Sequence, residues 1–158
     1  MGEIYGTDVF EKAKDKLLAL MTALITDMAS VDPKISAAYD YPNIVAPTFN
    51  AVSVHLFAAS TLDSRDLSSS SSGPTVLYEM TFAVRVHIAH MDGAYDSDKI
   101  ARLMNSVNNK LNQNKDLGDS FRMKYTDSFK FNEKFDESDT IGGEFTAIVH
   151  GHATHTQE

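Results

Sequence analysis

Six histidines are the residues of this chain whose types and spacing come nearest to a reactive site. His150 and His152 stand two residues apart, so they would share one face of a strand, and His155 follows shortly after. His87 and His90 close an earlier stretch of strand-like alternation. If the two strands were neighbours, three imidazoles could converge as zinc or nickel ligands. We nevertheless expect no metal, because no helical His-x-x-x-His pair is present and no carboxylate stands where it would orient a ligating imidazole.

Residues for nucleophilic or acid–base catalysis are no better arranged. There is no cysteine, which excludes disulfides, thiolate metal ligands and a cysteine nucleophile. The serines lie outside any Gly-x-Ser-x-Gly motif, and the glycines near residues 142 and 151 do not form a phosphate-binding loop. Four acidic residues lack the spacing of a calcium-binding loop and are interpreted as a solvated turn: Glu133, Asp136, Glu137 and Asp139. We therefore predict no catalytic residues, no cofactor and no enzymatic activity.

The acidic composition argues against specific binding of nucleic acid. The chain carries 22 acidic residues against 14 lysines and arginines, a formal net charge of −8. Binding of DNA or RNA needs a clustered basic footprint, and the bases here are scattered, with the densest group at residues 12–16. No membrane segment is predicted either, because the longest apolar stretch, Leu17–Ile25, is shorter than the roughly 20 residues that cross a bilayer. Residues 1–5 lack the features of a signal peptide, so we expect a protein made in the cytoplasm.

Two long stretches alternate apolar and polar residues, as a strand with one buried face does. In Tyr78–His90 the even-numbered positions from 78 to 88 are apolar, and the thirteen residues of this stretch would span roughly 43 Å. Phe49–Ala59 alternates in the same way. We predict two long strands of one hairpin, each with one face on the core and the other face open to solvent or to a partner.

The segment between these strands, Thr61–Pro74, is predicted to be a mobile arm that contacts a neighbouring molecule on assembly. Ser68–Ser72 is a run of five serines followed by Gly-Pro, a composition that cannot pack a core. Arg65 and Asp66 are the charged residues of this arm and are predicted to bind a partner. The polar faces of the two strands supply three further candidates for partner binding: His55, Arg85 and His87.

The remaining periodicities predict two helices and further strands. A helix capped by Thr7 or Asp8 is expected over Val9–Ser30, with Phe10 on its apolar stripe, and a second helix over Asp96–Asn112. Phe121–Phe135 and Glu144–Thr154 are expected to be strands. The predicted fold is a single α+β domain over residues 1–158, a mostly antiparallel twisted sheet with a long β-hairpin arm, packed by two helices.

This layout resembles that of the tail-terminator (tail-completion) proteins of long-tailed bacteriophages, which are small, cysteine-poor α+β proteins. The resemblance covers most of the chain and is one of layout. Only the serine run departs from the family pattern. The matching stretches are Val9–Ser30, Phe49–Ala59, Tyr78–His90, Asp96–Asn112 and Gly142–Thr154.

The resemblance implies a structural virion protein at the head-proximal end of the tail. It would form a homo-hexameric ring, stop polymerisation of the tail tube protein and join the tail to a head-completion (neck) protein. Genomic DNA would pass through the ring without specific binding, which suits a charge of −8 per subunit. Because Arg85 lies on the polar strand face, its reversal to glutamate is expected to leave the fold intact and to block tail joining.

Two alternatives come from other classes of protein. One is a small metal-binding hydrolase centred on His87, His150 and His152. The other is a soluble adaptor domain for protein–protein interaction. The mass of the native protein in solution, with and without a chelator, would separate these alternatives from a ring-forming protein.

Overall fold

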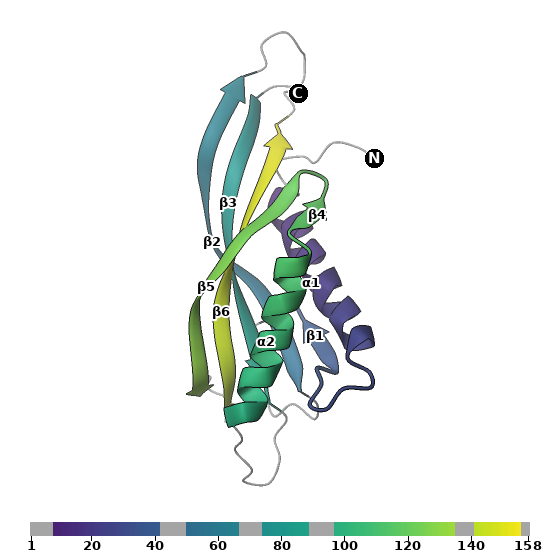
Figure 1. Cartoon of the computed structure of the whole chain (residues 1–158). Coiled ribbons are helices and arrows are strands. Elements are labelled where there is room, and N and C mark those ends of the chain that lie inside the picture. The colour runs from purple at the N-terminus through teal and green to yellow at the C-terminus, as the bar shows by residue number, and fades with distance from the viewer. Residues whose placement is uncertain (1–7, 42–49, 67–73, 89–96, 135–140, 156–158) are drawn as a thin grey trace.

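A computed structural model of the chain describes residues 8–41, 50–66, 74–88, 97–134 and 141–155, with the side chains of residues 64–66 left out. Helices and strands follow one another in a mixed order along the chain (Figure 1). Their bounds are α1 (Val9–Asp27), β1 (Ala37–Tyr39), β2 (Ala51–Asp66), β3 (Pro74–His87), α2 (Ser97–Gln113), β4 (Asp116–Gly118), β5 (Phe121–Lys134) and β6 (Ile141–Thr154).

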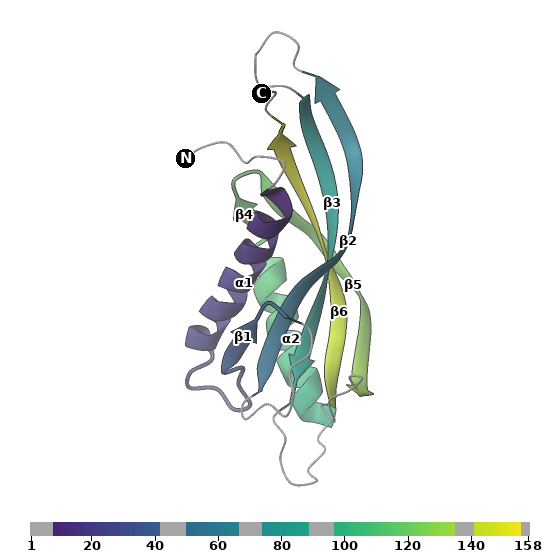
Figure 2. The same cartoon turned by 180° about the vertical axis from the view of Figure 1, so that it is seen from behind.

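The described strands form one sheet of six in the order β1-β2-β3-β6-β5-β4. Every neighbouring pair is antiparallel except β1 with β2. Both helices lie against one side of this sheet, as the two opposite views show (Figures 1 and 2). The predicted α+β class, with two helices on a mostly antiparallel sheet, is confirmed.

The helices are held by apolar stripes that recur every three or four residues. The buried residues of α1 are Val9, Ala13, Leu17, Met21 and Leu24, and those of α2 are Ile100, Leu103, Met104, Val107 and Leu111. Phe10, predicted on the stripe of α1, is instead 37% exposed, and its ring meets that of Tyr78 edge-on at 5.4 Å. The buried stripe of α1 runs through Val9 and Ala13, so the side chain of Phe10 lies at the border between the buried and exposed faces of the helix. Within the described residues no helix is long and apolar enough to span a membrane.

The sheet supplies the other half of the core through the predicted apolar face of β3. Met80, Phe82, Val84 and Val86 have no exposed surface. They share one hydrophobic cluster with the helix stripes and with residues of β2, β5 and β6. The period of two in this part of the sequence therefore predicted the correct core face.

The long hairpin is longer than predicted on one strand and shifted on the other. β2 continues to Asp66, and the register of β2 with β3 runs from Ala51–His87 to Asp66–Pro74. Residues 61–66, predicted to be loop, are thus strand, because they pair with the first residues of β3. Figure 1 shows the hairpin reaching beyond the ends of both helices. The serine run, residues 68–72, lies outside the described residues, so its mobility stays a prediction.

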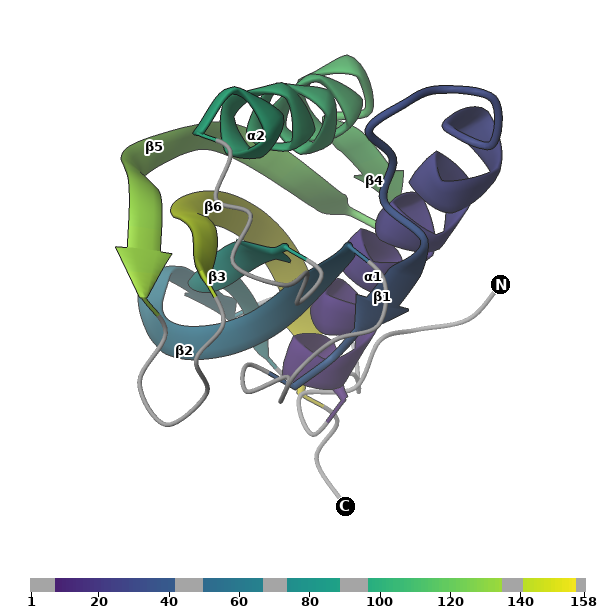
Figure 3. The ribbon, with the colours of Figure 1, turned by 90° about the horizontal axis from the view of Figure 1, so that it is seen from below.

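Irregularities in the outer strands shape the sheet. The register of β2 shifts at Phe57 and at Leu62. β5 has three register shifts, and Ser128 and Asn132 adopt positive φ angles of 54° and 62°. Bulges of this kind bend a strand and raise its twist. The view along the strands shows the resulting curl of the sheet (Figure 3).

Candidate functional site

The face of the sheet turned away from the helices carries most of the polar residues of the strands. The register places them in rows across four strands. One row is Ser53 on β2, Arg85 on β3, Glu144 on β6 and Lys130 on β5. A second row consists of Ser60, Glu79, His150 and Arg122. In the first row charges of opposite sign are cross-strand neighbours, which stabilises the sheet. In the second row His150 stands between Glu79 and Arg122.

The centre of the first row is a half-buried ion pair between Arg85 and Glu144. Arg85 Nε donates a hydrogen bond to Glu144 Oε2, and the two side chains are only 21% and 22% exposed. His55 lies beside this pair, and burial, followed by the Arg85 guanidinium, lowers the pKa of its imidazole. In the second row His150 Nε2 and Glu79 Oε2 lie 3.0 Å apart. The face is therefore self-paired in the monomer.

At the end of the face, His87 and Ser53 are buried. Ser53 Oγ and His87 Nε2 lie 3.0 Å apart, and neither residue has exposed surface. A serine beside an imidazole is the arrangement of an activated nucleophile. Here both groups are closed off from solvent, so a substrate has no access to them in this conformation. The contact joins β2 to β3 rather than forming a reactive site.

Burial makes His87 a source of acid sensitivity. Burial, followed by the nearby Arg85 charge, lowers the pKa of His87 to about 4, against an ordinary value of 6.5. In the unfolded chain the imidazole takes up its proton near pH 6.5, whereas the folded chain resists it until about pH 4. The contribution of His87 to the free energy of unfolding is therefore fully present above pH 6.5. It is lost as the pH falls from 6.5 to about 4.

We predict that His87 accounts for a loss of about 2 kcal/mol of unfolding free energy between pH 7 and pH 5. Urea unfolding of the wild type at both pH values measures the total loss. His87→Gln, which keeps a polar group but cannot titrate, should lose less by about that amount. An equal loss in both proteins would contradict the assignment.

The histidine cluster on which the alternative metal-binding hydrolase depends is not assembled among the described residues. β3 and β6 are neighbours, as it requires, but the antiparallel register places His87 beside Gly142 and His150 beside Glu79. These two histidines are therefore separated along the sheet by the distance from Glu79 to His87 on β3. The expectation that the histidines have no carboxylate partner is wrong for His150, which meets Glu79. No group of three potential metal ligands occurs among the residues that the structure describes.

The predicted partner-binding residues fall in three different settings. Arg65 and Asp66 pair with the start of β3 at the tip of the hairpin, and their role stays a prediction. His55 and Arg85 lie together on the polar face. His87 is fully buried, so its side chain offers no surface to a partner in this conformation.

Sequence reasoning missed Glu144 and Glu79, the acids that pair with Arg85 and His150. Each acid is more than 55 residues from its partner, so no local spacing reveals the pair. The only signal was the alternation itself, which places both acids on polar strand faces. The pairing appears once the register of β3 with β6 is known.

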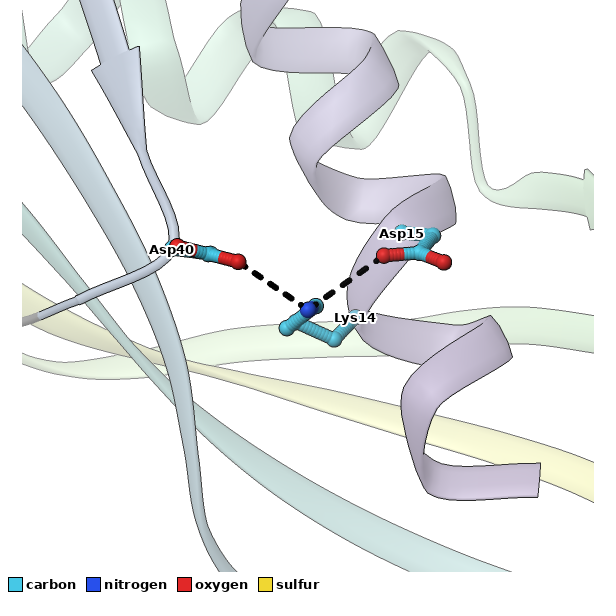
Figure 4. Close-up of polar contacts among 3 residues, drawn as sticks. All are labelled: Lys14, Asp15 and Asp40. Carbon is cyan, nitrogen blue, oxygen red and sulfur yellow. Dashed lines mark hydrogen bonds and ion pairs between the residues drawn. The ribbon is translucent and has the colours of Figure 1, made fainter. Parts of the chain in front are cut away.

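A separate polar contact fastens the edge of the sheet to a helix. Lys14 of α1 points toward Asp40, just after β1, with Nζ 3.1 Å from Asp40 Oδ2, and toward Asp15 at 3.4 Å (Figure 4). The hydrogen bond to Asp40 is the main cause that raises the pKa of Lys14. The ammonium group of Lys14 is neutralised by the carboxylates of Asp15 and Asp40. The contact therefore holds the segment after β1 against α1 and does not form a binding site.

The comparisons with known proteins give a likeness in fold to a solved structure. No family model matches the chain, and no curated protein matches it. Among solved structures, the chain is similar to a sheath/tube terminator of an extracellular contractile injection system, PVC, determined by cryo-EM in the extended state. The sequence identity is 16% and the TM-score is 0.52. The likeness covers 99% of this chain and 59% of the terminator, and at this identity it shows a shared fold.

Proposed function

We propose that this chain is a tail terminator, a structural protein that binds the end of a tail tube and stops its growth. The observation that carries the proposal is the likeness in fold to a sheath/tube terminator over 99% of the chain. The layout of helices and strands in the sequence supports the same class independently. The polar face adds to it, because its charged groups are paired with one another and its buried serine–histidine contact is out of reach of a substrate.

The finer form of the proposal is a homo-hexameric ring at the head-proximal end of a phage tail. Its partners would be the tail tube protein and a head-completion protein, and it would remain in the virion. A ring requires head-to-tail contacts that close by rotation. Genomic DNA would slide through the lumen, and a net charge of −8 per subunit disfavours binding of its phosphates.

A second candidate setting is a contractile injection system, since the matched terminator belongs to one and its description names both a sheath and a tube. In that setting the partners would be the ends of the sheath and of the tube. Head joining and DNA passage would not be part of the function. The two settings share the same basic activity, which is to cap a growing tube.

Disruption of the gene in its own phage or particle-producing strain tests this shared activity. We predict that tubes lose their narrow length distribution and that complete particles fall below the detection limit of negative-stain electron microscopy. In a phage, filled heads and separate tails should accumulate. Complementation with the wild-type gene is the matched control and should restore tube length. Normal particles from the disrupted strain would refute the proposal.

A further inference from the structure

The two outer parts of the sheet are only partly covered by neighbouring strands. β1 pairs with β2 only along Ala51–Ser53, and β4 pairs with β5 only at Phe121 and Arg122. Within the described residues, no strand pairs with the outer side of residues 54–66, here called the β2 edge, or of residues 124–134, the β5 edge. A strand edge that no neighbouring strand covers can pair with a strand of another molecule.

Large apolar side chains are concentrated on these two edges. Eight large hydrophobic residues are exposed among the described ones, and five of them lie on the edges. The five residues are Phe57 and Leu62 on the β2 edge and Tyr125, Phe129 and Phe131 on the β5 edge, each between 41% and 56% exposed. Both edges therefore have the composition of an interface that is covered on assembly.

The charges of the two edges are opposite in sign. The β5 edge has three lysines against Asp127 and Glu133, a net charge of +1 in a chain of net charge −8. The β2 edge has Asp63 and Asp66 against Arg65, a net charge of −1. Two β2 edges would repel each other weakly, whereas a β2 edge and a β5 edge attract. The charge pattern thus selects the unlike pair.

We propose that the β2 edge of one copy pairs with the β5 edge of the next copy. Because the two edges lie on opposite sides of the sheet, the contact is head-to-tail and repeats from copy to copy. β2 and β5 run in opposite directions, since three antiparallel pairings separate them. If neighbouring copies are related by rotation about an axis parallel to the strands, each strand keeps its direction from copy to copy. The β2 edge of one copy and the β5 edge of the next are then antiparallel, and the sheet continues across the contact.

The regular stretches between the bulges are the segments that pair. On the β2 edge this stretch is residues 58–61, between Phe57 and Leu62, and on the β5 edge it is residues 125–127. Tyr125 lies within the second stretch, and the other four exposed apolar side chains lie beside the two stretches. All five would be buried in the contact. This inference deepens the proposed function by naming the interface of the ring, and it rests on that function only for closure into a ring.

The absence of cysteine from the chain permits a direct test by disulfide trapping. Ala58→Cys and Ser60→Cys mark the β2 edge, and Asp127→Cys marks the β5 edge. All three positions are exposed, and the register places them on the face away from the helices. Each β2-edge variant is mixed with the β5-edge variant, one carrying a size tag, and the concentrated mixture is oxidised. Directly opposed residues of antiparallel strands bring their Cβ atoms within reach of a disulfide.

We predict that at least one mixture gives a disulfide-linked heterodimer as its main product. Adding Phe57→Ser and Leu62→Ser to the β2-edge variant should lower its yield about tenfold, because apolar burial is lost. Val31→Ser is the matched control, since Val31 is 50% exposed and lies off both edges. Homodimers of single variants as the main product, or no cross-link in any mixture, would overturn the proposed pairing. If cross-linking fails while gene disruption still abolishes length control, the interface is wrong and the terminator function stands.

Discussion

Replacing Gly151 by alanine is expected to lower the free energy of unfolding by about 3 kcal/mol, because the new methyl group has no room. Gly151 is buried in β6, and a Cβ there would lie 2.5 Å from Cε1 of Phe121 and 3.2 Å from Cε of Met80. Phe121 is itself only 1% exposed, so its rigid ring cannot turn aside into solvent. Urea unfolding followed by circular dichroism measures the change, with an unaltered m-value as the sign that only stability has moved.

Gly143→Ala is the matched control in the same strand. A Cβ at this position would lie 2.5 Å from the sulfur and 2.8 Å from Cγ of Met104. Methionine is flexible and can adopt another rotamer, so we expect a loss of about 1 kcal/mol. If the alanine at 143 proved more harmful than the alanine at 151, the rigidity of the neighbouring ring would not be the deciding factor.

The second large effect is expected for Arg85→Glu, which should lower the free energy of unfolding by about 3 kcal/mol. The substitution replaces a half-buried ion pair by two adjacent carboxylates, because Arg85 and Glu144 are register partners on β3 and β6. The ion pair with Glu144 therefore leads to a different prediction from the one made from sequence, which was that charge reversal at Arg85 leaves the fold intact. If Arg85→Glu prevents assembly, the cause could be unfolding of the subunit as well as the loss of a contact between Arg85 and a partner protein.

Urea unfolding of three proteins separates the pair from a general effect of charge. Arg85→Glu combined with Glu144→Arg should recover more than half of the loss, because the attraction is restored in reverse. Lys124→Glu changes the charge by the same amount at an exposed position and should stay within about 0.5 kcal/mol of the wild type. A double variant as unstable as the single one would show that the ion pair is not the cause.

The architecture could be predicted from the sequence wherever one periodicity runs undisturbed. The alternation of Met80, Phe82, Val84 and Val86 gave β3 its correct core face, and the stripes of both helices were largely correct. The outer strands were harder, because a bulge inserts one residue and inverts the pattern after it. Leu62 stands at such a shift in β2, and the alternation there was lost, so the end of β2 was predicted to be loop.

The candidate surface could be predicted only as a face, without its internal contacts. The sequence places Arg85 and His55 on the polar side of their strands, which is correct, but it does not contain the register that brings Glu144 to Arg85. Burial of His87 was also beyond a period-two pattern, since alternation separates the two faces of a strand but does not say which end of a face is covered. Both facts depend on segments far apart along the chain.

The order of strands has a consequence for the way the chain is made. Among the described strands β6 is synthesised after the other five, yet it lies in the middle of the sheet, between β3 and β5. The hairpin of β2 and β3 can form early. The other edge of β3 cannot pair with β6 until residues 141–154 have left the ribosome. Long-range pairing of this kind slows folding and leaves apolar strands open to wrong associations meanwhile. We therefore expect a nascent chain to be most prone to aggregation before β6 is available to pair with β3.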